Sequence, residues 1–228
     1  MGYLLLEGGA EFGGAMREPD LAAIELAGGL DASVCIIPTA AAPDNNHVRA
    51  GKNGIRWFKS MGVRNVSAVS LIDQQSANDP AVADALRTAK LIYMLGGFTH
   101  YLAQTLLGSK AWLAVLDAYQ NGAVVAGSSA GAMVMCEHYY DPKSGKVMPG
   151  LNLVPNSCVL PHHNTFGKNW AEKLKRLLPG VSLVGIDEYT GVLTNDTEWQ
   201  VLGAGAVTIY RNNTIQRYEN GQKLFLAE

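Results

Sequence analysis

The chain has 228 residues, of which 48% are hydrophobic and 17% charged, and its formal net charge is −2. A composition of this kind is typical of a folded globular protein and excludes intrinsic disorder, which requires high charge and few large apolar side chains. The 18 Lys and Arg residues, against 20 Asp and Glu, form no basic tract. This excludes a nucleic-acid-binding protein, because nothing would neutralise the phosphates. No apolar run is long enough to span a membrane, and the length favours one domain over residues 1–228.

The cysteines are few and widely spaced. Cys35, Cys136 and Cys158 make an odd number and show no CxxC spacing. This pattern argues against a disulfide framework or a structural zinc site and favours a reducing compartment. Because the N-terminal residues show no signal-peptide pattern, we expect a cytoplasmic protein. We also expect neither a cofactor nor a metal.

Short apolar runs alternate with helical patterns in the first half of the chain. The runs are typical of strands buried on both faces, and they lie at 3–6, 34–37, 66–69, 91–95 and 123–126. Between them, apolar residues at helical spacing predict one helix after Pro19-Asp20, a second that ends at Gly62, a third that opens at Asp79-Pro80 and a fourth that closes at Asn121-Gly122. This alternation predicts an α/β fold with a mostly parallel sheet flanked by helices.

The second half of the chain becomes richer in strand patterns. Further buried strands are predicted at 158–160 and 183–186, followed by strands at 192–194, 200–202, 206–210 and 215–218. Asn212-Asn213 predicts a hairpin turn between the last two. We therefore expect a β-rich C-terminal end on the α/β fold.

A candidate nucleophile follows the strand at 123–126. Residues 127–131 read Gly-Ser-Ser-Ala-Gly, the G-x-S-x-G pattern, and a stretch of small residues typical of a helix comes next. Glycines on both sides allow a sharp strand-to-helix turn that exposes the central serine. A tight turn without chemistry would also fit, but this context favours Ser129, the residue with the correct spacing to both glycines, as a nucleophile.

A serine nucleophile needs a base, and the chain has five histidines. His47 lies in a polar loop, His100 lies near a helix start, and His138 is expected at the far end of the helix that follows Ser129. The remaining pair, His162-His163, follows a predicted strand and Pro161, at the strand end where sites form in open sheets. Either ring could act on Ser129.

An orienting carboxylate is available after the strand at 183–186. Asp187 and Glu188 both lie at this strand end, so a Ser-His-acid triad is the economical interpretation. The order Ser, His, acid along the chain differs from that of α/β-hydrolases, in which the acid precedes the histidine. It matches class I glutaminase-like folds.

Several motifs together resemble those of the peptidase E and cyanophycinase family of serine peptidases. They are the segments 8–11, 95–99, 127–132, 151–155, 161–162 and 185–188. The resemblance implies a class I glutamine amidotransferase-like α/β fold, with Ser129 as nucleophile, His162 as base and Glu188 as orienting acid. It also implies that the N–H groups of Gly97 and Ala130 form the oxyanion hole.

The chain departs from that family where substrates are recognised. The family's arginines after the base are absent, Phe98 replaces a usual asparagine, and Lys168 is the nearest cation. A lysine provides only a point charge where an arginine would bind an anion through two hydrogen bonds. We name Phe98, His163, Lys168 and Trp170 as candidate substrate-binding residues, although Trp170 would equally fit ordinary packing.

These patterns favour a serine exopeptidase or dipeptidase that acts on a small peptide, with aspartyl and β-aspartyl peptides as candidate substrates. A cyanophycinase-like hydrolase and a catalytically weak glutaminase-like binding domain are the alternatives. The sequence favours no nucleic-acid or membrane partner, and a monomer or homodimer is expected.

Overall fold

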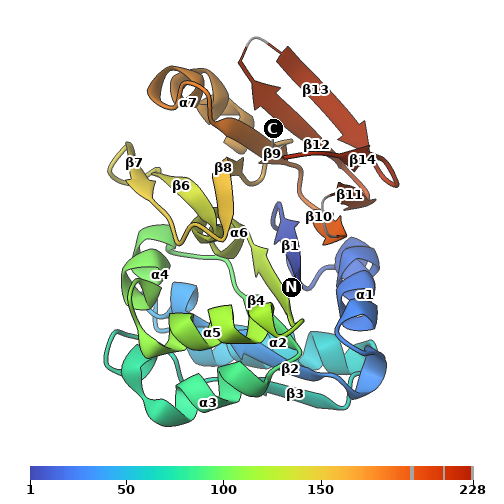
Figure 1. Ribbon diagram of the computed structural model, residues 1–228, viewed down its shortest axis with the longest axis vertical. Helices are drawn as coiled ribbons and strands as arrows, with labels where there is room; N and C mark the ends of the chain where they lie inside the picture. Colours follow the sequence, from blue (N-terminus) through green and yellow to red (C-terminus); the bar gives the residue numbers. More distant parts are fainter. Residues whose placement is uncertain (196–197, 213, 227–228) are drawn as a thin grey trace.

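The structure is a computed structural model that describes residues 1–195, 198–212 and 214–226. Two sheets organise these residues (Figure 1). The strands of the larger sheet, in chain order, are β1 (Tyr3–Glu7), β2 (Ser33–Ile37), β3 (Asn65–Ala68), β4 (Leu91–Met94), β5 (Val124–Ser128), β10 (Thr190–Asn195), β11 (Glu198–Gly203) and β14 (Lys223–Leu224). The strands of the smaller sheet are β6 (Cys136–Asp141), β7 (Lys146–Pro149), β8 (Val154–Leu160), β9 (Ser182–Ile186), β12 (Ala206–Arg211) and β13 (Thr214–Glu219).

The larger sheet has the order β14-β11-β10-β1-β5-β4-β2-β3. Its strands β1, β5, β4, β2 and β3 are parallel, as the alternating pattern predicts, whereas β10, β11 and β14 add antiparallel pairs. The smaller sheet has the order β13-β12-β9-β8-β6-β7, in which only β6, β8 and β9 pair in parallel. The expected mostly parallel sheet is therefore confined to the N-terminal half, and the structure has a mixed α/β fold with two sheets.

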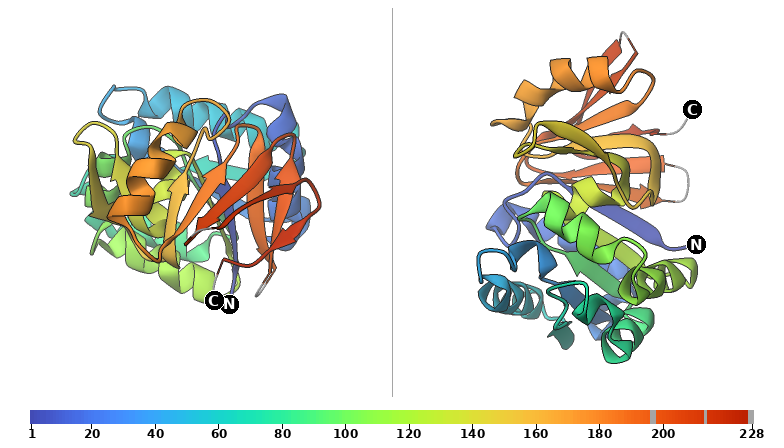
Figure 2. Two further views of the ribbon diagram at one scale, coloured as in Figure 1. Left: turned by 90° about the horizontal axis from the view of Figure 1, so that it is seen from above. Right: turned by 90° about the vertical axis from the view of Figure 1, so that its left-hand side faces the viewer.

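Helices cover both faces of the parallel strands. The helices are α1 (Arg17–Leu26), α2 (His47–Ser60), α3 (Pro80–Thr88), α4 (Thr99–Leu106), α5 (Lys110–Gln120), α6 (Ala130–Met135) and α7 (Ala171–Leu177). Seen from the side, α2 lies on one face of the larger sheet and α5 on the other (Figure 2). The pleat explains this: Leu5 of β1 joins the core under α1 and α2, while Leu4 and Leu6 join the core under α3 and α5.

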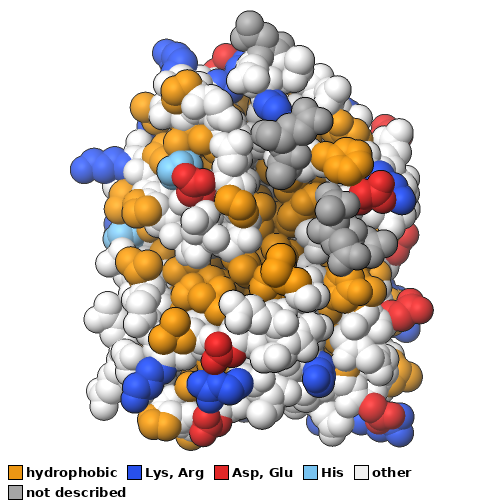
Figure 3. Space-filling view, in the orientation of Figure 1, with side chains coloured by type: hydrophobic (Ala, Val, Ile, Leu, Met, Phe, Trp, Pro, Cys, Tyr) orange, Lys and Arg blue, Asp and Glu red, His pale blue; other side chains and the backbone are white. Residues whose placement is uncertain are grey.

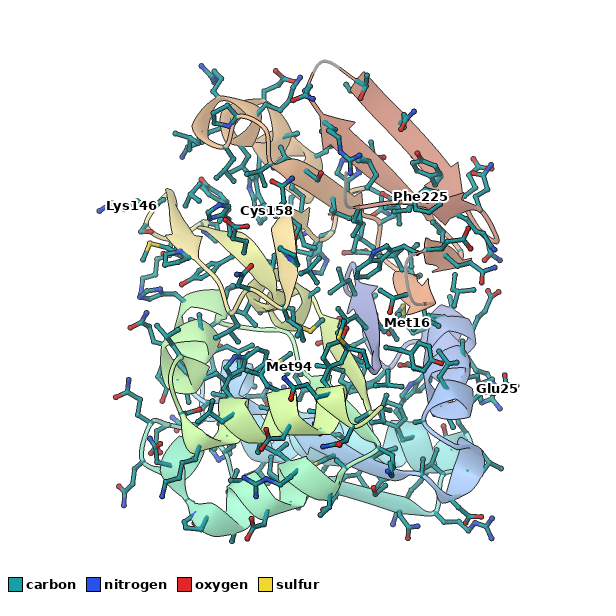
Figure 4. The ribbon with its side chains drawn as sticks, in the orientation of Figure 1. Met16, Glu25, Met94, Lys146, Cys158 and Phe225 are labelled. Atoms are coloured by element: carbon teal, nitrogen blue, oxygen red, sulfur yellow. The ribbon has the colours of Figure 1, made fainter. Side chains whose placement is uncertain are left out.

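The core extends from the larger sheet to the smaller one. Met94 of β4 and Cys158 of β8 belong to one continuous cluster of buried residues, and both lie in the interior in Figure 4. All three cysteines are buried and unbridged, as their spacing predicts. On the face in Figure 3, hydrophobic side chains gather across the middle, and positive and negative side chains are interspersed nearer its edges.

One helix is shorter than the sequence predicts. We expect His138 at the far end of the helix after Ser129, but α6 ends at Met135 and His138 lies in β6. Tyr139 and Tyr140 of β6 are buried and pair with β7, and aromatic residues favour strands. The predicted turn at Asn212-Asn213 includes Asn213, which lies outside the described residues.

Among the described residues, no helix combines the length and the apolar composition needed to cross a membrane.

Candidate active site

Ser129 lies at a strained turn between β5 and α6. Its backbone has φ 48° and ψ −107°, a conformation that residues with a side chain rarely adopt and that recurs at functional sites. The flanking glycines make this turn possible because a Cβ on Gly127 would lie 2.5 Å from the Gly131 carbonyl carbon, and one on Gly131 would lie 2.3 Å from the Met94 oxygen. The Ser129 N–H donates to the Glu7 carbonyl at 3.0 Å and holds the turn against β1.

His162 lies beside Ser129, in the loop that follows β8. Its Nε2 is 3.1 Å from the Ser129 Oγ, and its Nδ1 is 2.7 Å from the Glu188 Oε1. The backbone N–H of His162 donates to the Gly8 carbonyl at 2.7 Å. The ring of Phe166 stacks on the imidazole, with 4.8 Å between centroids. Ser129, His162 and Glu188 thus form a hydrogen-bonded row, in the arrangement that the resemblance implies.

Strand register brings the acid to this row. β8 and β9 are parallel, with Leu160 opposite Gly185, so the loops that follow them lie at the same edge of the sheet. The Glu188 N–H donates to the Asn164 side-chain oxygen at 2.9 Å, which joins the two loops. The Glu188 carboxylate can therefore accept a hydrogen bond from the Nδ1–H of His162, which leaves Nε2 free to accept the Ser129 hydroxyl proton.

The neighbouring His163 has a different environment. The residue is 7% exposed, with Nδ1 3.3 Å from Asp187 Oδ1 and Nε2 2.9 Å from the Tyr210 hydroxyl. Burial lowers the pKa of His163 below its ordinary value. The Asp187 carboxylate also accepts the Ala206 N–H at 3.1 Å. Both nitrogens of His163 are engaged in this buried contact, so the ring does not offer a hydrogen bond to Ser129 or a free polar surface to a substrate.

Gly97 and Ala130 lie next to Ser129 on two different turns. A Cβ on Gly96, the residue before Gly97, would lie 3.3 Å from the Ser129 Cβ, so the β4–α4 turn lies directly against the serine. Neither the Gly97 N–H nor the Ala130 N–H donates to a backbone acceptor in the described part of the chain. The described hydrogen bonds therefore engage neither N–H group.

A cavity of about 510 Å³ opens beside Gly97. Phe98, which is 40% exposed, lines it together with residues of α4 and of the β6–β7 hairpin. Its walls are mainly apolar, and polar groups come from His100, Asp141 and Lys143. The size suits a small ligand or one large side chain.

The other candidate binding residues lie on the segment after His162. Lys168 is exposed in the short 3-10 helix Gly167–Trp170. Trp170 is half-buried and packs against Tyr140 and Phe166, with centroids 5.1 Å and 5.6 Å apart. Trp170 therefore supports Phe166, which itself covers the His162 ring.

Glu11 is a polar residue of the site region to which the sequence motifs assign no catalytic role. Its carboxylate lies 3.3 Å from the Gly96 N–H and 3.0 Å from the Ser128 hydroxyl. The only sequence signal was its position in the Gly-Gly-Ala-Glu segment. Phe166 and Asn164 were also missed, because their contacts depend on how the loop after β8 folds back. Among the residues that the structure describes, no cluster of three or more His, Cys, Asp or Glu side chains could hold a metal ion.

Comparison with known proteins identifies the family of this chain. The sequence model of peptidase family S51 matches residues 4–202. The chain belongs to peptidase family S51. It is a serine-type peptidase, and the resemblance inferred from its motifs is confirmed.

Curated relatives of this family S51 chain include two cyanophycinases. One, from Geminocystis herdmanii, is 27% identical over 214 residues, which cover 86% of this chain and 75% of the relative. The other, from Synechococcus elongatus, is 30% identical over 228 residues, which cover 91% and 67%.

Solved structures share the fold along nearly the whole chain. The crystal structure of a peptidase from an acI-B1 Actinobacterium has a TM-score of 0.88 at 29% identity and covers 99% of this chain and 97% of its own. A putative peptidase E protein from Listeria monocytogenes has a TM-score of 0.64 at 21% identity, with coverage of 96% and 98%, and shares the fold.

Proposed function

We propose that this chain is a serine exopeptidase or dipeptidase that hydrolyses short peptides through a Ser129-His162-Glu188 triad. The observation that carries the proposal is the continuous row from Ser129 Oγ to His162 Nε2, at 3.1 Å, and from His162 Nδ1 to Glu188, at 2.7 Å. Such a row gives a serine hydroxyl a base and gives that base an orienting acid. The strained backbone of Ser129 supports a functional role for the turn.

In the proposed reaction, Ser129 Oγ attacks the scissile carbonyl carbon while His162 Nε2 accepts the hydroxyl proton. Glu188 stabilises the resulting imidazolium by accepting the hydrogen bond from Nδ1. His162 then returns the proton to the leaving amine, and an acyl-enzyme forms at Ser129. Water, deprotonated by His162, attacks the ester carbonyl, and the carboxylate product leaves with Ser129 restored.

The N–H groups of Gly97 and Ala130 are the proposed oxyanion hole. Each tetrahedral intermediate carries a negative oxygen near Ser129, and two backbone donors would stabilise it. Loss of one such donor typically costs about 3 kcal/mol of transition-state stabilisation. The described hydrogen bonds engage neither N–H group, which, together with the closeness of the Gly96-Gly97 turn to Ser129, supports this assignment.

The proposed substrate is a short peptide whose side chain enters the cavity beside Gly97, against Phe98. Lys168 is exposed and would contribute only a single-point charge to an acidic group. Two relatives are named cyanophycinase, which supports a cyanophycinase-like hydrolase as the second candidate. The chain order Ser, His, acid supports our further proposal that the fold is of the class I glutamine amidotransferase-like type.

A fluorophosphonate probe tests the triad, because it labels only an activated serine. We expect the wild-type protein to take label at Ser129 and Ser129→Ala to take none. A panel of dipeptides and β-aspartyl dipeptides then tests the substrate class. An unlabelled wild-type protein that cleaves no peptide would favour the catalytically weak glutaminase-like binding domain instead.

A further inference from the structure

Glu11 joins the two turns that carry the proposed oxyanion-hole donors. It lies in the loop after β1, and its carboxylate accepts the Gly96 N–H at 3.3 Å through Oε1 and the Ser128 hydroxyl at 3.0 Å through Oε2. Gly96 directly precedes Gly97, and Ser128 is separated from Ala130 only by Ser129. One side chain therefore contacts both sides of the site without being part of the triad row.

Packing around Glu11 leaves little freedom in this arrangement. A Cβ on Gly96 would lie 2.9 Å from the Glu11 Oε1 and 3.3 Å from the Ser129 Cβ. The β4–α4 turn is thus in contact with the carboxylate on one side and with the nucleophile on the other. A shift of Glu11 would release the Gly96 N–H and allow the Gly97 donor to move relative to the Ala130 donor.

The surroundings of Glu11 include both acidic and basic side chains. The acids Glu7 and Asp20 are buried nearby, and burial raises the pKa of both carboxyls, which favours their neutral forms. Arg49 and Arg56, which line cavities shared with Glu11, provide the opposite charge on the solvent side. A carboxylate is well suited to this position because it accepts two hydrogen bonds at once, from the Gly96 N–H and from the Ser128 hydroxyl.

We propose that Glu11 is a positioning residue that fixes the distance between the Gly97 and Ala130 oxyanion-hole donors by holding the Gly96 N–H and the Ser128 hydroxyl together. The inference rests on the proposed serine-peptidase function. It assigns Glu11 no contact with the substrate, so Glu11 acts on the transition state and not on substrate affinity. The predicted effect of its loss is a lower kcat at nearly constant KM.

Three variants test this role, together with a matched control. Glu11→Ala removes both contacts and is expected to lower kcat about ten- to a hundredfold, less than or similar to the loss of an oxyanion donor, with KM within about twofold. Glu11→Gln keeps an acceptor for Gly96 and an amide that can donate to the Ser128 oxygen, so we expect it to recover most of kcat. Glu25→Ala, which removes an exposed carboxylate of α1 on the outer side of the molecule (Figure 4), is expected to leave kcat unchanged.

Ser128→Ala removes the same link at its other end. Combined with Glu11→Ala, it should cause a smaller loss than the product of the two single losses, because the two residues act through one hydrogen bond. The affinity for a peptide aldehyde, whose adduct with Ser129 mimics the oxyanion, should fall in parallel with kcat. Thermal unfolding of each variant shows whether it is folded at the assay temperature.

The outcomes separate this inference from the proposed function. If wild-type Ser129 takes no fluorophosphonate label and cleaves no peptide, the proposed function fails. The positioning role is refuted if the wild type is active and the Glu11→Ala variant, although folded, keeps the wild-type kcat or changes only in KM. A Glu11→Gln variant as impaired as Glu11→Ala would also overturn it, because the hydrogen bonds would then not be what matters.

Discussion

Gly9 lies against the imidazole ring of His162, and substituting it tests whether that ring acts as the base. Gly9 has φ +118°, a conformation that residues with a Cβ rarely adopt. A Cβ at this position would lie 2.3 Å from the His162 Cε1, 2.7 Å from Nδ1 and 2.8 Å from Nε2. Gly9→Ala therefore forces the ring away from its place between Ser129 and Glu188.

The size of the effect follows from these distances. Ordinary van der Waals contact begins at 3.4 Å, compared with 2.3 Å here, so the ring or the loop must move by roughly 1 Å. A misplacement of about 1 Å in a catalytic group can cost ~10²-fold in rate. We expect kcat to fall by about a hundredfold, and the backbone strain to lower the free energy of unfolding by about 1–3 kcal/mol.

The assay compares Gly9→Ala with a glycine substitution in the same segment that meets no obstacle. A Cβ on Gly14 has nothing within 4 Å, so Gly14→Ala should retain both activity and stability. Dipeptide hydrolysis and the rate of fluorophosphonate labelling report on the site, and circular dichroism confirms folding at the assay temperature. In a His162→Ala background, adding Gly9→Ala should cause little further loss, because the displaced ring is already absent.

Two results would refute the reasoning. A folded Gly9→Ala variant with a kcat within twofold of wild type would mean that the position of His162 does not limit the reaction. A large additional loss in the His162→Ala background would mean that Gly9 acts through another group, such as the loop backbone.

Three further predictions concern the charged groups. Burial raises the pKa of Asp20 from 3.8 to about 7, so the folded state binds more protons between these values. The free energy of unfolding should then fall as pH rises through this window, by up to about 1.4 kcal/mol per pH unit, and urea unfolding of Asp20→Asn should show a smaller decline, since the raised pKa of buried Glu7 contributes in the same direction. Glu188→Gln should lower kcat by ~10²–10⁴-fold while KM stays similar, because Nδ1 loses its charged acceptor; an unchanged kcat would exclude Glu188 as the orienting acid. His163→Ala should destabilise the protein by about 1–3 kcal/mol, because the buried Asp187 Oδ1 and the Tyr210 hydroxyl lose their contacts with the ring, and more strongly than His162→Ala in the same urea titration; equal effects would contradict a structural role for His163.

Local sequence signals predicted the parts of the fold that depend on local interactions. Asp79 caps α3 by accepting the Ala81 N–H at 2.8 Å, as its position before a proline indicates. The helix that closes at Asn121-Gly122 also ends there. β6 and β7 were not predicted, because their residues follow a stretch of small apolar residues that fits a longer helix equally well. Their strand conformation depends on pairing with each other and with β8, which is a long-range interaction.

The sequence by itself determined the strained turn at Ser129, because a G-x-S-x-G segment between a buried strand and small residues has few other uses. It also restricted the base to His162 or His163 and the acid to Asp187 or Glu188. Local patterns could not choose within these pairs, since neighbours in the chain share the same local signals, and only the family resemblance singled out His162 and Glu188. The tertiary structure adds the different surroundings of the two members of each pair. His162 has a left-handed backbone, at φ 50°, and the adjacent rings of His162 and His163 have different partners. The register of β8 and β9 brings Glu188 to His162 and Asp187 to His163. The contact of Glu11 with Ser128 spans 117 residues, a distance over which only the fold can bring two side chains together.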